Sequence, residues 1–349
     1  MRNFKAFGGN PDAQSGVYKL QNYSAIVASG AWYSVAGQQE YLNPGTYSWT
    51  CPAGCTSVSA VCIGGGGGGN GTWAQSAGGG GGLGWKNNIS VTPGQSYTVV
   101  VGSGGSRGNS SSAGKGNMSY FINQSTVGGG GGGNNDAGRY ADSMQSGRNS
   151  NSGGGYTGDG GGRGGQTNNY QGGGGAGGYN ADGGNNSSNG SSSGGSAAGG
   201  GYYSSTYGVS AGGGTGIYGK RTDYTPTRNG HGHVNDYSPG NKGIAFNSVY
   251  NPSTVGGGRG GSNRTGTISG QNTGWNGAPG ENPWGGGSNS GFWSANANNI
   301  QGGFPGGGGG GAGTSWGGGR GADGAVRLIW AGSTSGPRNY PTQNVEDIT

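Results

Sequence analysis

Runs of consecutive glycines limit what this chain can fold into. Three of them have six residues each: Gly64–Gly69, Gly128–Gly133 and Gly306–Gly311. Glycine loses more backbone freedom on folding than any other residue, and it brings no side chain to bury. Such a run therefore either stays unfolded or gains its order from hydrogen bonds of the backbone.

The rest of the composition favours order. Glycine and proline, 98 and 12 of 349 residues, reach a level that is typical of low-complexity chains. However, only 9% of the residues are charged, and the chain carries 9 Trp and 19 Tyr. Disordered segments are poor in aromatic residues, and collagen would need a sustained Gly-X-Y period that is absent here. We therefore expect folded glycine runs.

Short strand-like segments frame the glycine-rich part. Residues 46–50 and 57–63 read as two strands around a turn at Pro52–Gly54, and residues 89–91 and 97–101 read as a β-hairpin around Thr92–Gln95. Ser119–Ile122 and Ala325–Trp330 are further strand candidates. We expect Ala325–Trp330 to pair with a strand from residues 46–127, which would pin both ends of the glycine-rich segment and lower its entropy.

The glycine runs themselves can be ordered as rods. An extended left-handed helix with three residues per turn has no internal hydrogen bonds, so neighbouring glycine helices can bond to each other. Each such bond contributes about 0.5–1.5 kcal/mol net. A rod in the middle must be nearly pure glycine, whereas we expect a rod on the outside to need glycine only at every third residue.

The predicted fold is therefore mainly β, with little or no α-helix. A small β-sheet or sandwich scaffold, closed by a C-terminal strand, carries a large inserted domain of packed polyglycine-II-type rods. Residues 1–45 are predicted to be an N-terminal attachment arm or small domain, and residues 46–127 with 322–332 to be the scaffold. Residues 128–321 are predicted to be the glycine-rich rod domain with Tyr- and Trp-bearing loops, and residues 333–349 a C-terminal tail.

Several functional classes find no support in the sequence. The net charge of +6 is scattered, so nucleic-acid binding is not expected, and no apolar run is long enough for membrane insertion. The N-terminus lacks the apolar core of a signal peptide. No glycine run ends in the Lys-Ser/Thr of a phosphate loop, and no catalytic set of side chains stands out. We expect a protein that is not an enzyme and holds no cofactor.

The histidines and cysteines are the candidates for a metal or redox site. His231-Gly232-His233 lies in a Gly/Asn-rich stretch, where a solvated loop is favoured over a metal site. The turn at Pro52–Gly54 would place Cys51 and Cys55 opposite each other on adjoining strands, either as a disulfide or as two free, half-buried thiols. The Cys-x3-Cys spacing has no second pair, which argues against zinc.

Tyr-rich loops between the glycine runs are the candidate binding site. Mixtures of Tyr, Ser, Asn and Gly supply rigid amphipathic rings and adaptable polar groups, as binding loops do. The alternative is that these rings cap the rods, and packing is favoured for the group of Trp275, Trp284, Phe292 and Trp293. The candidate receptor-binding residues are Tyr202, Tyr203, Tyr207, Tyr218, Tyr224 and Tyr237.

The framing segments carry a resemblance that covers about residues 45–345. GTYSWTCPAGCTSVSAVCIGGGGGG, GGGGGLGWKNNISVTPGQSYTVVVGSGG and GGGGGGAGTSWGGGRGADGAVRLIW resemble the glycine-rich virion proteins of tailed phages, especially cyanophages. The glycine-rich middle is also similar in style to the polyglycine sandwich of receptor-binding adhesins on long tail fibres.

This resemblance implies an exposed virion protein of tail-fibre or adhesin type. It would bind a host-cell surface glycan or protein through loops of the glycine-rich domain. Residues 1–45 lie outside the resemblance; read as an attachment arm or small domain, they would join the protein to other virion proteins, and self-association stays open. The alternatives are a purely structural virion component (decoration, fibre shaft or tail joint) and a cellular extracellular-fibre protein.

Overall fold

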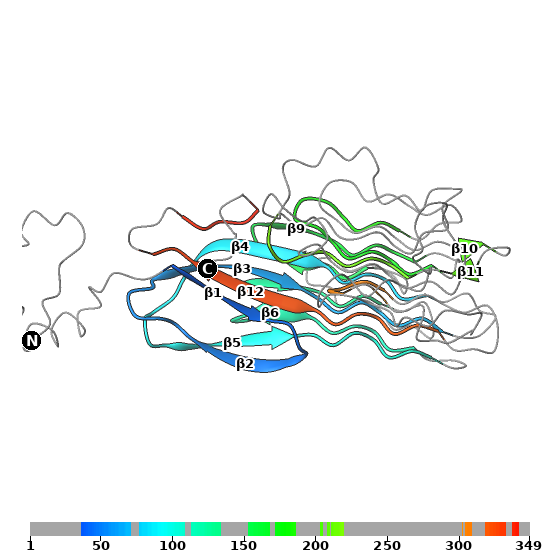
Figure 1. The fold of residues 1–349 in the computed structure, drawn as a ribbon, viewed down its shortest axis with the longest axis horizontal. Helices are drawn as coiled ribbons and strands as arrows, with labels where there is room; N and C mark the ends of the chain where they lie inside the picture. The colour runs from blue at the N-terminus through cyan, green and yellow to red at the C-terminus, as the bar shows by residue number, and fades with distance from the viewer. Residues whose placement is uncertain are drawn as a thin grey trace, which may run out of the picture.

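The computed structural model contains two antiparallel five-stranded sheets and, among the residues that it describes, no helix (Figure 1). The described residues are 36–70, 77–108, 113–133, 153–167, 172–185, 203–204, 208–209, 211–219, 302, 304–308, 318–332 and 337–341. The prediction of a mainly β protein is confirmed.

The chain crosses between the two sheets several times. The first sheet has the order β1-β12-β3-β4-β9, with strands Gly37–Tyr41, Ala325–Trp330, Ser57–Ile63, Leu83–Ser90 and Gly160–Gly162. The second sheet has the order β2-β5-β6-β7-β8, with strands Gly45–Thr50, Ser96–Val101, Ser119–Phe121, Val127–Gly129 and Tyr156–Thr157. A separate pair joins β10 (Tyr203–Ser204) to β11 (Gly208–Val209).

The C-terminal strand closes the first sheet as predicted. β12 pairs antiparallel with β3, where Ala325 lies opposite Ile63 and Leu328 opposite Ala60. On its other side β12 pairs with β1, which lies within the residues predicted to be an arm. β7, β8 and β9 fall within residues 128–321 or at their boundary; β7 pairs with β6, β9 pairs with β4, and β8 pairs with β7.

The two predicted turns form, but each joins strands of different sheets. The amide of Gln95 donates to the carbonyl of Thr92 at 3.0 Å, and Gly54 and Gly94 have φ of 75° and 78°, values that favour glycine. The predicted hairpin is wrong, because β4 pairs with β3 and β5 pairs with β2. Cys51 and Cys55 likewise do not lie on adjoining strands.

The chain changes sheets at these turns because of the apolar side of each strand and the length of each connection. Residues 51–56 and 91–95 are longer than the two-residue loops that most favour a hairpin. With this length the chain passes from one sheet to the facing sheet, so the apolar residues of β2 and β5 pack on those of β3 and β4. The two connections bond to each other, from Cys51 N to Gln95 O and from Gly94 N to Cys51 O, both at 2.9 Å.

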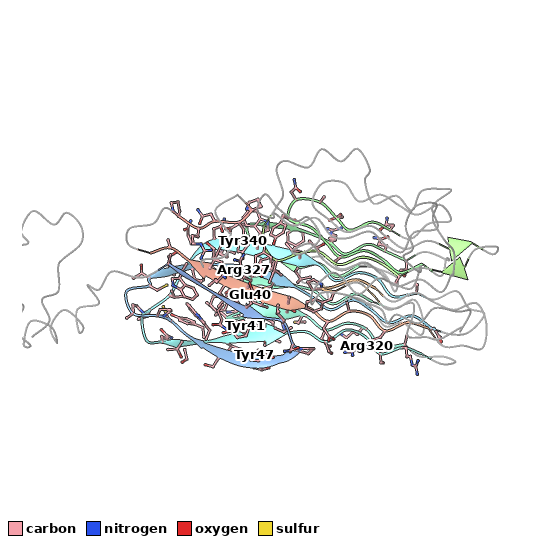
Figure 2. The ribbon with its side chains drawn as sticks, viewed as in Figure 1. Glu40, Tyr41, Tyr47, Arg320, Arg327 and Tyr340 are labelled. Carbon is pink, nitrogen blue, oxygen red and sulfur yellow. The ribbon has the colours of Figure 1, made fainter. Side chains whose placement is uncertain are left out.

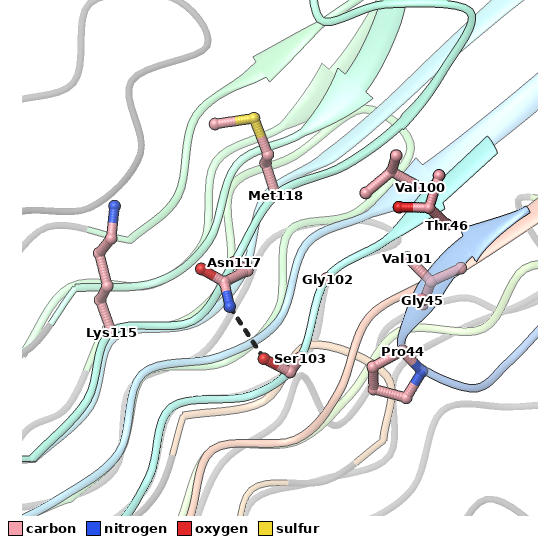
Figure 3. Close-up of a pocket in the computed structure, with 10 residues that line it drawn as sticks. All are labelled: Pro44, Gly45, Thr46, Val100, Val101, Gly102, Ser103, Lys115, Asn117 and Met118. Atoms are coloured by element: carbon pink, nitrogen blue, oxygen red, sulfur yellow. Dashed lines mark hydrogen bonds between the residues drawn. The ribbon is translucent and has the colours of Figure 1, made fainter. Parts of the chain in front are cut away.

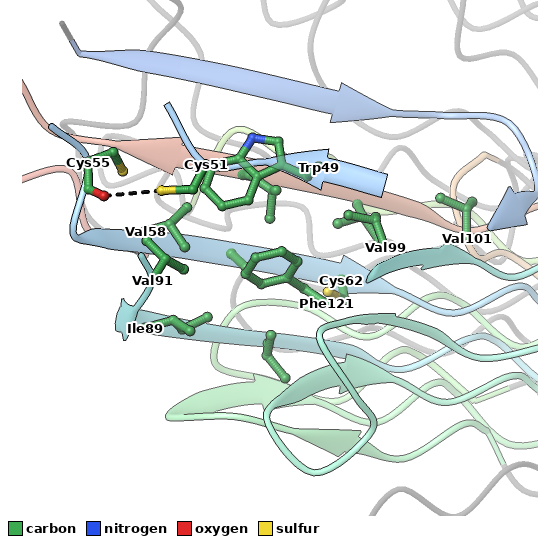
Figure 4. Close-up of a cluster of buried hydrophobic side chains, with 14 residues drawn as sticks. Trp49, Cys51, Cys55, Val58, Cys62, Ile89, Val91, Val99, Val101 and Phe121 are labelled. Carbon is green, nitrogen blue, oxygen red and sulfur yellow. Dashed lines mark hydrogen bonds between the residues drawn. The ribbon is translucent and has the colours of Figure 1, made fainter. Parts of the chain in front are cut away.

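A side-chain core fills the space between the sheets (Figure 4). Trp49 meets Phe121 edge to face, with ring centroids 5.7 Å apart at 76°. Cys51, Cys55 and Cys62 are buried free thiols, and Cys51 Sγ donates to the carbonyl of Cys55 at 3.1 Å. Of the two alternatives for Cys51 and Cys55, the structure has the free thiols.

A second cluster covers the other face of the first sheet. In β3 the residues that face the core between the sheets, such as Ala60 and Cys62, alternate with Val61 and Ile63. Val61 and Ile63 pack in this second cluster together with Ile329 of β12. The cover comes from distant parts of the chain and includes Tyr179, Ile217 and Tyr340. The central strands β3 and β12 are therefore buried on both faces.

Most strands of the two sheets continue directly into glycine-rich runs, which extend side by side toward β10 and β11 (Figure 1). β3 leads into Gly64–Gly69, residues 77–82 lead into β4, and residues 318–324 lead into β12. We call these packed runs the glycine bundle. Its described segments are 64–69, 77–82, 102–108, 113–118, 130–133, 153–155, 163–167, 172–185, 211–216, 306–308 and 318–324.

Gly64–Gly69 lies inside the bundle, and its hydrogen bonds repeat every three residues. Its amides donate in turn to three neighbouring segments, at 2.8–2.9 Å. The donor–acceptor pairs are Gly64–Gly82 and Gly67–Gly79, then Gly65–Asn117 and Gly68–Gly114, then Gly66–Ala322 and Gly69–Gly319. A Cβ would overlap the carbonyl oxygens of Gly130, Ser103, Gly307, Gly133 and Ser106 in the order of residues 64–68.

The prediction that this run has glycine backbones as neighbours is confirmed. A repeat of three is what a helix with three residues per turn would give, while its left-handed form stays a prediction. For Gly306–Gly311, residues 309–311 lie outside the described residues, and Gly306 departs from the other run positions with φ of 85°.

Runs on the outside of the bundle also follow a period of three. One residue in three is exposed or half-buried along 163–167 and 318–324, at Arg163 and Gln166 and at Arg320 and Asp323. Residues 102–106 follow the same period with Ser103 and Ser106, but Arg107 is exposed as well. The expectation that an outer run needs glycine only at every third residue is therefore wrong for these runs, because two positions in three face other segments. Along 113–119 every third residue is buried, but these positions are Ala113, Gly116 and Ser119, so one of the three is glycine.

Candidate functional site

The predicted Tyr residues do not converge on one site within the described part of the chain. Tyr203 belongs to β10, at the end of the glycine bundle far from the sheets (Figure 1). Tyr218 is half-buried and packs on the second cluster, over the first sheet. Tyr202, Tyr207, Tyr224 and Tyr237 lie outside the described residues, so binding by these rings stays a prediction.

Tyr218 contacts a buried charge that the sequence reasoning missed. Arg327 is at the centre of β12 and is 0% exposed (Figure 2). The centre of its guanidinium lies 4.3 Å from the centroid of the Tyr218 ring. Its Nε is 3.4 Å from Oε1 of Glu40, and its Nη2 donates to Oε1 of Gln38.

This arrangement compensates the cost of burying a cation. A charge away from water needs an opposite charge, hydrogen bonds or an aromatic face. Glu40 and Gln38 come from β1, whereas Tyr218 lies just after the bundle segment 211–216. Arg327 thereby connects the edge strand β1 and the closing strand β12 to the residues that follow this segment.

Two stacked tyrosines lie beside this cation. The rings of Tyr179 and Tyr340 have centroids 5.9 Å apart at an interplanar angle of 18°. Burial raises the pKa of Tyr340 to about 12, against the opposing influence of Arg327. Burial also raises the pKa of Tyr179 well above its ordinary value. Both phenols therefore stay neutral at physiological pH, which is consistent with packing and gives no sign of acid–base chemistry.

Residues 337–341 form a strap across the second cluster. Asn87 binds the backbone of Tyr340 in two directions, since its Nδ2 donates to the carbonyl at 2.6 Å and its Oδ1 accepts from the amide at 2.8 Å. Nη1 of Arg338 donates to the carbonyl of Gly37 at 2.6 Å. The strap and β1 are thus held together at the sheet end of the molecule.

An open groove lies where β2 and β5 meet the glycine bundle (Figure 3). Thr46 and Val100 form part of one wall, and Lys115, Asn117 and Met118 form part of the other. The Nδ2 atom of Asn117 donates to Oγ of Ser103 at 2.9 Å. The lining mixes apolar and polar groups without a set of side chains that could activate a substrate.

The described residues give no metal or membrane element. They contain no group of three or more potential His, Cys, Asp or Glu ligands. His231 and His233 lie outside them, so the expectation for that pair stays open. Nor does the described part contain a helix long and apolar enough to cross a membrane.

The signal for Arg327 was present in the sequence. In Ala325–Trp330 every residue except Arg327 is apolar, whichever face of the strand it points to. This pattern is typical of a strand that is buried on both faces, and such a strand would have to bury Arg327. The partners could not be read from the sequence, because Gln38 and Tyr218 are remote from β12 in the chain.

A family model for a glycine-rich domain matches residues 42–281, more than half of the chain. The chain belongs to this glycine-rich domain family. The match begins just before β2 and includes most of both sheets together with a large part of the glycine-rich segment. No curated protein matches the sequence.

Proposed function

We propose that this glycine-rich domain protein is a non-enzymatic virion protein of tail-fibre or adhesin type, exposed on a tailed phage. It binds a glycan or protein on the host-cell surface through the Tyr-rich loops of its glycine-rich part. Residues 1–45 join it to other virion proteins.

The arrangement of the two ends of the molecule supports this proposal. The sheets, with β1 and the strap, lie at one end, and β10 with Tyr203 lies at the other end of the glycine bundle (Figure 1). Attachment at the sheet end would leave the opposite end free to meet a cell. This is the observation that carries the proposal.

The chemistry of the bundle agrees with binding by loops. Inside the bundle the segments meet through backbone groups, which are the same at every position and cannot distinguish one partner from another. Discrimination then falls to side chains in the connecting loops. A few aromatic rings usually dominate the binding energy of such surfaces.

The test is a cell-binding assay with purified protein. Labelled protein is titrated onto cyanobacterial cells, and its ability to block phage adsorption is measured. The variant replaces Tyr203, Tyr207 and Tyr224 by Ala, and Tyr120→Ala on the sandwich is the control. We expect the triple variant to bind at least about tenfold more weakly, because hot-spot rings contribute 2 kcal/mol or more. The melting temperature should stay unchanged.

Three outcomes would contradict the proposal. Failure of the wild-type protein to bind cells, together with its location inside the particle or along a shaft, would favour a structural virion component. Unchanged binding by the triple variant would remove these rings from the site. A large fall in melting temperature would show that the rings are core residues.

A further inference from the structure

Strand β2 presents an edge that no other described strand covers. All six of its residues, Gly45–Thr50, pair with β5 in continuous register. In the described part of the chain, β5 is the strand bonded to β2, which leaves the outer side of β2 as the edge of the second sheet. Unpaired backbone groups on such an edge are a template for another strand.

The other edges of the two sheets are short or occupied. β8 and β9 have two and three residues. In β1, Glu40 carries a charge that pairs with Arg327, and the carbonyl of Gly37 accepts a hydrogen bond from Arg338. These are the devices that protect natural edges from unwanted pairing, and β2 lacks them.

The side chains of β2 are suited to pairing with a copy of themselves. Thr46, Ser48 and Thr50 are exposed, and the strand contains no charged residue, no proline and no bulge. Trp49 points into the core, which fixes the orientation of the strand. In a two-fold interface the same strand lies on both sides, so a charged strand would place like charges opposite each other. An uncharged strand avoids this repulsion.

We propose that β2 of one chain pairs antiparallel with β2 of a second copy, about a two-fold axis near Ser48. The second sheet of one chain then continues into the second sheet of the other, and together they form one sheet across a homodimer. A second copy is the favoured occupant because it supplies a neutral edge of the same length and twist. The outward row of Ser and Thr hydroxyls stays solvent-facing on both chains.

The test measures the oligomeric state of the full chain by sedimentation across the micromolar range. Wild type should have twice the mass of one chain. Ser48→Lys should weaken the dimer at least about tenfold, because two like charges meet at the axis. The matched control is Thr98→Lys, which adds the same charge on the same face, on β5 directly opposite Ser48. That control should stay dimeric.

Charge reversal makes the test specific. An equimolar mixture of Ser48→Lys and Ser48→Glu should recover the dimer, while Ser48→Glu alone should not. A monomeric wild type would overturn the proposal, and so would a dimer that Ser48→Lys and Thr98→Lys affect equally. Melting curves of all variants confirm folding. Cell binding is measured separately, so failure here leaves the proposed function untouched.

Discussion

The two ends of the molecule are ordered by opposite means. Between the sheets, large side chains such as Trp49, Phe121 and Leu328 fill the space, and burial of apolar surface stabilises the fold. In the glycine bundle, backbones lie so close that a single methyl group would overlap a carbonyl oxygen at most described glycines. There the stabilisation comes from hydrogen bonds between segments and from close packing.

Sensitivity to side-chain size therefore changes sign along one chain. The sandwich should suffer when a side chain is shortened, and the bundle should suffer when one is added. β3 shows both regimes within a few residues, since it is lined by Val58 and Cys62 and then runs into Gly64 without a break.

The largest effect is expected from Gly66→Ala. Its methyl would overlap the carbonyl of Gly307, and backbone on every side leaves no room to shift. We expect a loss of at least about 5 kcal/mol, beyond what most single substitutions cause. The free energy of unfolding measures it. Ser106→Ala, on an exposed position of a neighbouring run, is the control. Equal stability of the two variants would contradict the close packing described here.

The converse change, Phe121→Ala, should cost about 3–5 kcal/mol through the cavity that it leaves. Phe121 is fully buried against Trp49 and Tyr97. Its neighbour Tyr120 lies half-buried on the opposite face, so Tyr120→Ala is the matched control. Hydrogen exchange should show faster opening of the sheets than of Gly64–Gly69. Uniform acceleration would mean that the two ends unfold as one unit.

Alkaline pH should act on the sheet end first. Burial raises the pKa of Tyr340 from 10.0 to about 12, so above pH 10 the unfolded chain loses this proton while the folded chain keeps it. The contribution of Tyr340 to stability is therefore complete below pH 10 and is lost as the pH rises toward 12, by roughly 2 to 3 kcal/mol. Melting curves across this range measure the fall. Tyr340→Phe should reduce it, and an identical fall in that variant would refute the assignment.

The smallest effect is expected from Gln166→Lys, at most about 0.5 kcal/mol. Gln166 is exposed on an outer run, and its backbone amide would still donate to Oδ1 of Asn185. The next residue, Thr167, is fully buried and donates to the carbonyl of Ala77 at 3.1 Å. Thr167→Lys should therefore be far more damaging. Similar melting temperatures for the two variants would count against the period of three.

The strands could be predicted from the sequence better than their partners. Ala325–Trp330 was predicted with its bounds and its pairing, because an apolar β-branched segment between glycines has few alternatives. β1 was not predicted as a strand, since Gly37–Tyr41 is polar and gains its structure from β12. Turn residues at Gly54 and Gly94 indicate a reversal of the chain, but they do not say whether the next strand stays in the same sheet.

The candidate site was less accessible to prediction. Tyr-rich segments indicate amphipathic loops, yet the same composition serves packing, and Tyr218 lies half-buried beside Arg327. Ring position depends on which runs are neighbours, and glycine runs of equal length carry no information about that choice. The proposed role of these rings therefore rests on the cell-binding experiment.

The three-residue repeat of hydrogen bonds has a further consequence for folding. A uniform glycine run that slides by one turn against its neighbours recovers the same bonds, so the bundle alone has no preferred alignment. The residues at the ends of each run must break this degeneracy. Ile63 before Gly64 and buried Asn70 after Gly69 fix one run, and Tyr179 and Ile217 anchor segments that no long strand holds. Misaligned but fully bonded species are thus the natural traps of this fold, and these few anchors are what excludes them.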